Sequence, residues 1–167
     1  GSWPQDSLNN LVWAIDQHQN QWVAGAGRQL LLASFPTLEH CRTFELPEGL
    51  EICATRTRIL PSKHGIFLFN VITRELTLLG TDTQDLRVLE HLDLSRNIPL
   101  PPDNENRKGV TEADYCEYTD RLIVLVPLEK SRLLSIGVDN GRIHHEERAN
   151  LPLFNLKKVE HDPDGRF

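Results

Sequence analysis

The sequence repeats one pattern: a short apolar run rich in strand-forming residues, a turn, and a second run of the same kind. The first copy has runs at residues 22–25 and 30–35 around a glycine-containing turn. The second copy has a run at 66–71, which a short polar turn connects to a run at 76–79. Apolar runs of this length, separated by turn residues, are typical of β-hairpins. The sequence therefore predicts a chain built from antiparallel hairpins.

The third copy of the pattern is the clearest. Its runs lie at 121–126 and 133–138, with a turn at 127–131 between them. Asp139-Asn140-Gly141 follows, and its Asn-Gly pair favours a tight hairpin turn.

The spacing of these runs points to a repeated sheet. Runs begin near Leu30, Ile66 and Leu133, which are 36 and 67 residues apart. Spacings of this order indicate stacked sheets, and propeller blades are the best candidate. We expect an all-β, propeller-like fold of about three to four blades, with a β-sandwich of similar hairpins as the alternative.

The end of the sequence, 162–167, reads Asp-Pro-Asp-Gly-Arg-Phe. It resembles the turn between the first two strands of a blade in WD-repeat β-propellers. The Gly-His and Trp-Asp dipeptides that mark that family do not occur in the sequence. The resemblance implies a partial propeller. Because an exposed sheet edge invites aggregation, we expect a partner strand, a chain that completes the ring or a homodimer contact to cover it.

The sequence divides into three kinds of segment. Residues 1–7 are expected to be a cloning remnant, Gly1-Ser2, followed by a flexible N-terminus, and residues 8–167 a single β domain. A Pro-rich polar insertion interrupts this domain at 97–109, and such a tract buries too little apolar surface to order itself. The apolar residues of 86–94, just before it, fit an extended strand about as well as a short helix.

Charge and composition exclude several kinds of partner. The formal net charge is −6, from 24 acidic and 18 basic residues, which opposes binding to a phosphate backbone. We therefore expect no nucleic-acid partner. No apolar stretch is long enough to span a bilayer. The three cysteines are widely spaced, and an odd number without a secretory signal favours an intracellular location, cytoplasmic or nuclear, with buried thiols.

Residues 144–147, His-His-Glu-Glu, could be considered as metal ligands. Neighbouring residues of a strand point to opposite faces, so each face would hold two ligands, fewer than the three of a catalytic zinc. A solvated outer strand is the better interpretation. The sequence has no Gly-x-Ser-x-Gly motif, and Gly25-Ala26-Gly27 is read as a hairpin turn. We expect no catalytic, cofactor-binding or metal-binding residue and no cofactor.

The function we expect is that of a non-catalytic protein–protein interaction or scaffold module in a larger intracellular assembly. Repeated hairpins give broad, rigid faces, and loops such as the insertion often carry recognition. Trp13 and Trp22 lie in predicted strands and are expected in the core. The candidate partner-binding residues are Ile98, Pro99, Leu100, Pro101, Pro102 and Phe154.

Two alternatives stay open. One is a metal-dependent propeller enzyme of the hydrolase or lactonase kind, with an ion such as calcium held by carboxylates and amides. Its candidate ligands are Asn70, Asp114, Asp120 and Asp139. The other is a purely structural β domain within a larger protein.

Overall fold

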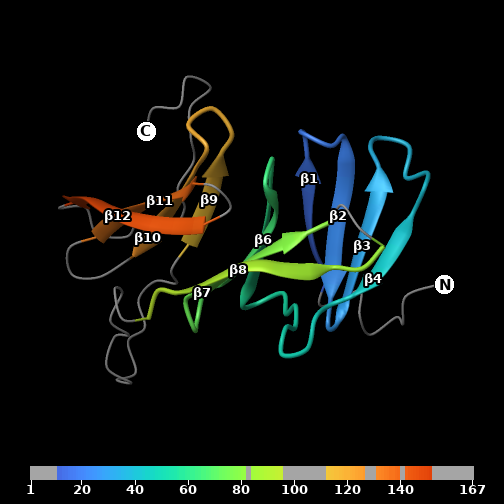
Figure 1. Ribbon diagram of the computed structural model, residues 1–167, viewed down its shortest axis with the longest axis horizontal. Coiled ribbons are helices and arrows are strands. Elements are labelled where there is room, and N and C mark those ends of the chain that lie inside the picture. The colour runs from blue at the N-terminus through green and yellow to red at the C-terminus, as the bar shows by residue number, and fades with distance from the viewer. Residues whose placement is uncertain (1–10, 82–83, 96–111, 127–130, 140–141, 152–167) are drawn as a thin grey trace. The chain divides into compact units, whose positions relative to one another are not determined.

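The computed structural model describes residues 11–81, 84–95, 112–126, 131–139 and 142–151 of the chain (Figure 1). In these residues twelve strands form three four-stranded sheets. Each sheet is a meander, in which strands that follow one another in the sequence are neighbours in the sheet. The all-β fold of antiparallel hairpin repeats is thereby confirmed. Within the same residues, no helix is long and apolar enough to cross a membrane.

The first sheet consists of β1 (Val12–Asp16), β2 (Gln21–Ala26), β3 (Gln29–Ser34) and β4 (Arg42–Glu45). The Asp16 carboxylate fixes the turn after β1, because its Oδ1 accepts hydrogen bonds from the backbone N–H groups of His18 and Gln19 at 3.0 and 3.1 Å. This turn ends at Asn20 in the left-handed conformation (φ 49°), which asparagine adopts more readily than most residues. Gly27 (φ 57°) allows the tight turn between β2 and β3.

The second sheet consists of β5 (Thr57–Ser62), β6 (Gly65–Asn70), β7 (Glu75–Gly80) and β8 (Arg87–Asp93). Gly65 begins β6 with a φ of 137°, which only glycine adopts without strain. A Cβ at this position would lie 2.2 Å from the carbonyl oxygen of Leu79 in β7. Glycine therefore permits the close approach of these two strands. The segment 86–94, which fitted a strand or a helix, forms the strand β8.

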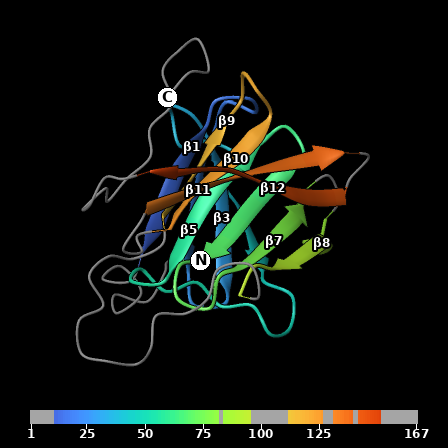
Figure 2. The same ribbon diagram turned by 90° about the vertical axis from the view of Figure 1, so that its left-hand side faces the viewer.

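The third sheet consists of β9 (Glu112–Cys116), β10 (Arg121–Val126), β11 (Ser131–Asp139) and β12 (Arg142–Leu151), which are labelled in Figure 2. The hairpin predicted at Asn140-Gly141 is confirmed, because β11 and β12 pair antiparallel with Asp139 opposite Arg142. The turn between β9 and β10 ends at Asp120 in the left-handed conformation (φ 52°). Asn20 occupies the corresponding place in the first sheet.

The structural repeat differs from the spacing predicted from the sequence. Strands β1, β5 and β9 open the three sheets, and they begin 45 and 55 residues apart. Leu30, Ile66 and Leu133 lie in β3, β6 and β11, which are the third, second and third strands of their sheets. The 36-residue repeat is therefore wrong. Second and third strands give similar apolar runs when both are buried, so the sequence did not distinguish them.

The chain forms two compact units, Gly1–Asn70 with Thr77–Leu89 and Val71–Leu76 with Glu90–Phe167. A single domain over 8–167 stays a prediction. The predicted tail at 1–7 and insertion at 97–109 lie outside the described residues.

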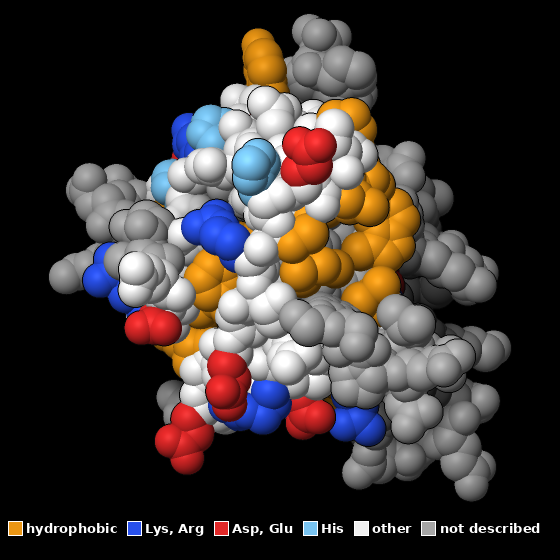
Figure 3. All heavy atoms as spheres, turned by 90° about the vertical axis from the view of Figure 1, so that its right-hand side faces the viewer, with side chains coloured by type: hydrophobic (Ala, Val, Ile, Leu, Met, Phe, Trp, Pro, Cys, Tyr) orange, Lys and Arg blue, Asp and Glu red, His pale blue; other side chains and the backbone are white. Residues whose placement is uncertain are grey.

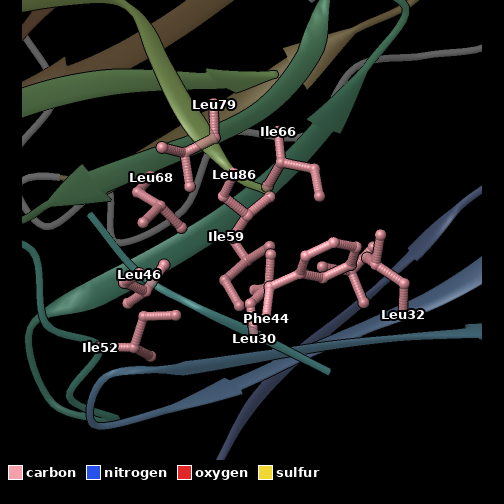
Figure 4. Packing of buried hydrophobic residues seen from close by; sticks show 11 residues of the cluster. Leu30, Leu32, Phe44, Leu46, Ile52, Ile59, Ile66, Leu68, Leu79 and Leu86 are labelled. Atoms are coloured by element: carbon pink, nitrogen blue, oxygen red, sulfur yellow. The ribbon is translucent and has the colours of Figure 1, made fainter. Parts of the chain in front are cut away.

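A hydrophobic cluster in the first unit joins the sheet β1–β4 to strands β5, β6 and β7 (Figure 4). Leu30 and Leu32 of β3 point into this cluster, as do Ile66 and Leu68 of β6. Sheet packs against sheet, as in the layered folds of antiparallel β proteins. The buried members of the cluster are Val23, Leu30, Leu32, Phe44, Leu46, Ile52, Ile59, Ile66, Leu68, Leu79 and Leu86.

Central strands of the second and third sheets are buried on both faces. In β6, Ile66 and Leu68 belong to the cluster, and the alternating Phe67 and Phe69 are also buried. In the second unit, the four consecutive residues 122–125 of β10 are all buried. Because successive side chains of a strand point to opposite faces, each of these strands is covered on both sides.

Candidate functional site

The sheet β1–β4 has a second apolar side, which points away from the cluster. Val12 and Ala14 of β1 pack against the cluster, so the residues that alternate with them point to the other side. The cross-strand register continues this side over β2 and β3. We call it the outer face, and it consists of Trp13, Ile15, Trp22, Ala24, Leu31, Ala33 and, just after β3, Phe35.

Much of the outer face is open to solvent. Trp13 is 59% exposed, Phe35 38% and Ile15 37%. Side chains of these types present on the order of 300 Å² of apolar surface at such exposures. That is about the size of the largest apolar patch on a typical monomer, and patches of this size are often functional. Figure 3, which views the molecule from the side of β4, shows hydrophobic side chains gathered on this part of the surface.

An aromatic cluster forms the centre of the outer face. The ring of Trp22 lies 5.3 Å from the ring of Trp13 and 5.1 Å from that of Phe35, measured between centroids. Tilted and edge-on pairs at these distances are favourable beyond the area that they bury. The indole N–H of Trp22 is buried and has no hydrogen-bond partner in the described part of the chain. Such a donor is costly, because it has lost its hydrogen bonds to water without gaining another partner.

The loop after β3 holds further apolar surface in a fixed conformation. The backbone N–H of Phe35 donates to the carbonyl of Asn20 at 3.0 Å, and that of Leu38 to the carbonyl of Ser34 at 2.7 Å. Leu38 is 57% exposed and has a φ of 61°, which is strained for a residue with a bulky side chain. The backbone hydrogen bonds therefore maintain a strained loop that exposes a leucine.

The outer face carries no charged side chain at the outward positions of β1, β2 and β3. Apart from Gln29, these positions hold aromatic, aliphatic and alanine residues. Arg28 and Glu45, at the β4 end of the sheet, form an ion pair with an Nε–Oε1 distance of 3.6 Å. A chain with a net charge of −6 thus has a neutral apolar face bordered by charges.

A polar pocket of about 270 Å³ lies elsewhere in the first unit, where the turns after β1 and β5 meet. Its lining includes Asp16, Ser62 and His64. The Asp16 carboxylate accepts hydrogen bonds from the backbone N–H groups of His18 and Gln19, and from Nε2 of Gln21 at 3.2 Å. Ser62 Oγ donates to the carbonyl of Gly65 at 2.9 Å and accepts from the backbone N–H of His64 at 3.2 Å. These polar groups stabilise the two turns, and the serine hydroxyl is not directed at an imidazole base.

The sequence-predicted partner-binding residues, 98–102 and Phe154, lie outside the described residues and stay a prediction. The side chains of residues 144–147 are also outside the described part. All three cysteines are free, but Cys41 is exposed, Cys53 is half-buried and Cys116 is buried. The expectation that all three thiols are buried is therefore wrong.

The four metal-ligand candidates occupy different elements. Asn70 ends β6, Asp114 lies in β9, Asp120 ends the next turn, and Asp139 ends β11. Asp120 accepts a hydrogen bond from the phenol of Tyr115 at 2.5 Å, and burial together with this bond raises the pKa of Tyr115. The described residues contain no group of three or more His, Cys, Asp or Glu side chains placed to hold a metal ion.

The outer face was missed by sequence reasoning. Trp13 was expected in the core, and this prediction is wrong, because Trp13 projects from the solvent side of β1. The available signal was the run Val12 to Ile15, which is apolar at every position instead of every second one. Such a run indicates that both faces of a strand are apolar, but it does not say which face is uncovered.

Comparisons with protein-family models, with curated proteins and with solved structures found no match to this chain.

Proposed function

We propose that the chain is a protein–protein interaction module that serves as a scaffold in a larger intracellular assembly, and that it binds a partner through the outer face. The observation that carries this proposal is the exposed aromatic cluster of Trp13, Trp22 and Phe35 on a face without charged side chains. Exposed tryptophans surrounded by apolar residues are the usual energetic centres of protein interfaces.

The size of the face supports this function. A standard interface buries about 800 Å² on each partner, so the outer face with about 300 Å² supplies an apolar centre of somewhat more than a third of that area. Its polar rim would include Arg28 and Glu45, which are already paired with each other. An apolar centre inside a polar rim is the usual anatomy of a specific interface.

We favour a propeller architecture as the explanation of this surface. Four-stranded meanders that follow one another along the chain have the form of propeller blades. A blade face within a propeller is covered by the neighbouring blade, as one side of β1–β4 is covered by β5 and β6 within the first unit. In this interpretation the outer face is a blade face that needs a neighbour. The free cysteines are in keeping with a reducing, intracellular compartment.

Affinity capture from a native lysate tests the proposal. The bait is the full chain, compared with Trp13→Glu, which places a charge on the outer face. The matched control is Tyr118→Glu, which changes an aromatic residue that is 76% exposed in the second unit. We expect a stoichiometric partner that is retained by the control and lost with Trp13→Glu. Equal capture by all three baits would refute binding through the outer face.

A variant that lacks residues 97–108 distinguishes binding through the outer face from binding through the insertion, which the sequence predicts as the binding site. Loss of the partner in this deletion, with retention in Trp13→Glu, would place binding on the insertion. Loss in both variants would mean that the two regions contribute together. If the deletion variant retains the partner and Trp13→Glu loses it, binding is on the outer face.

A further inference from the structure

We infer that the partner on the outer face is an uncharged apolar face of another β-sheet, contributed by a different protein and stacked on β1–β4. This inference rests on the proposed function, because it names the class of partner for the same surface. Three features of the first unit carry it: the sheet-on-sheet contact on the other side of β1–β4, the pattern of large and small side chains, and the absence of charge at the outward positions of β1 to β3.

The other side of the same strands already makes a contact of this kind. Val23, Leu30 and Leu32 project from β2 and β3 into the cluster that β5 and β6 cover. The outer face uses the alternate residues of the same strands, so its side chains have the same spacing along and between strands. A second sheet on the outer face would continue the layering that the first unit has established, at about 10 Å from β1–β4.

Large and small side chains alternate across the outer face. One row across the strands reads Trp13, Ala24, Leu31, and the next reads Ile15, Trp22, Ala33. Ala24 is partly exposed and lies lower than Trp13 and Leu31 on either side of it, whereas Ala33 is buried beneath its neighbours. Side chains of a facing sheet interdigitate with a surface of this form, so a partner strand with apolar residues at every second position would fit over Ala24.

The electrostatics restrict the partner further. A charged group brought over β1 to β3 would lose its hydration without gaining an ion pair, because the outward positions of these strands hold no charge. Glu45, the charged residue on this side of β4, is already paired with Arg28. An acidic or basic peptide is therefore a poor match. A second copy of the chain would add another net charge of −6 to the complex, whereas a different protein is free to carry a complementary charge.

Site-specific photo-crosslinking tests the inference directly. The full chain carries p-benzoylphenylalanine in place of Trp13, is irradiated in the native lysate, and the attachment point is mapped by mass spectrometry. The same replacement of Tyr118 is the control. We expect crosslinks from position 13, and none to the same protein from position 118. The inference requires that the attachment points lie in apolar strands of a β-sheet domain.

Several outcomes would overturn the inference. These are attachment to a helix, to an unstructured or acidic peptide, or to a second copy of this chain, which doubles the mass. Ile15→p-benzoylphenylalanine provides a second position if the first variant does not fold, as judged by circular dichroism. No crosslink from either position, while the partner is still captured, would also overturn it. Capture that does not depend on Trp13 would instead refute the proposed function, so the two failures are distinguishable.

Discussion

Replacement of Gly65 by alanine tests the packing of β6 against β7. Gly65 has a φ of 137°, and a Cβ there would lie 2.2 Å from the carbonyl oxygen of Leu79. The obstacle is backbone within a sheet, which cannot move aside as the end of a flexible side chain can. Gly65→Ala therefore combines the strain of an unfavourable φ with a steric overlap. Together these should lower the free energy of unfolding by about 3 kcal/mol or more.

Gly49→Ala is the matched control. Gly49 also has a positive φ, 86°, but a Cβ there would meet no atom within 4 Å. The control therefore contains the backbone strain alone, which costs about 1 kcal/mol. Urea unfolding followed by tryptophan fluorescence measures both variants. With a slope of about 2 kcal/mol per M, the midpoint should fall by about 1.5 M for Gly65→Ala and about 0.5 M for Gly49→Ala.

Equal shifts of the two midpoints would refute the reasoning, because they would mean that β7 does not lie against Gly65. A stable Gly65→Ala protein with an unchanged midpoint would contradict both the φ of this residue and the strand contact. Either result would remove the physical basis for the closely packed second sheet.

Three further predictions concern other residues, each with its own readout. Asp16→Ala should lower the free energy of unfolding by about 2 kcal/mol in urea denaturation, because the carboxylate accepts three hydrogen bonds, whereas a loss below about 0.5 kcal/mol would contradict this role. Tyr115 has a folded-state pKa above its ordinary value of 10, so the unfolded chain releases this proton first and stability should fall as the pH rises above 10. Tyr115→Phe should remove that part of the decline when urea midpoints at pH 9 and 11 are compared, and an identical decline in both proteins would refute it. Leu38→Gly should raise the thermal midpoint or leave it unchanged, since glycine relieves the strain at a φ of 61°, and a clear fall would show that the leucine is needed for folding.

The sequence predicted local structure well where turn chemistry was explicit. The Asn140-Gly141 pair in the sequence predicted a hairpin because such pairs favour tight turns, and the strands on either side, β11 and β12, do pair antiparallel. The sequence of the β8 segment fitted a strand and a short helix about equally well, and there is a physical reason. The segment lies at the edge of its sheet, with Val88 and Leu89 exposed, so it lacks the period-two pattern of a strand with one buried face. The repeat length was misjudged because β3 and β6 are both buried strands with similar apolar runs.

The candidate site was beyond prediction from the sequence because it depends on what covers a strand. Trp13 and Leu30 both lie in apolar runs of the first sheet, yet Trp13 faces solvent and Leu30 lies in the core. This difference follows from the packing of β5 and β6 on one side of β1–β4, which is a contact between distant parts of the sequence. Local patterning gives the faces of a strand, and only tertiary packing assigns one of them to the interior.

The outer face as a binding surface is tested most directly by the dissociation constant of the captured partner. Isothermal titration calorimetry should show binding at least tenfold weaker for Trp13→Glu than for the original chain, as expected at the centre of an interface. Tyr118→Glu should bind within about twofold of the original, since Tyr118 is not a residue of the outer face and single surface changes outside an interface have little effect. Tyr118→Glu should keep the original thermal midpoint, because this side chain is largely exposed. Trp13→Glu should stay folded with a slightly lower midpoint, because it loses the ring contact with Trp22. An unchanged dissociation constant for a folded Trp13→Glu protein would contradict the account.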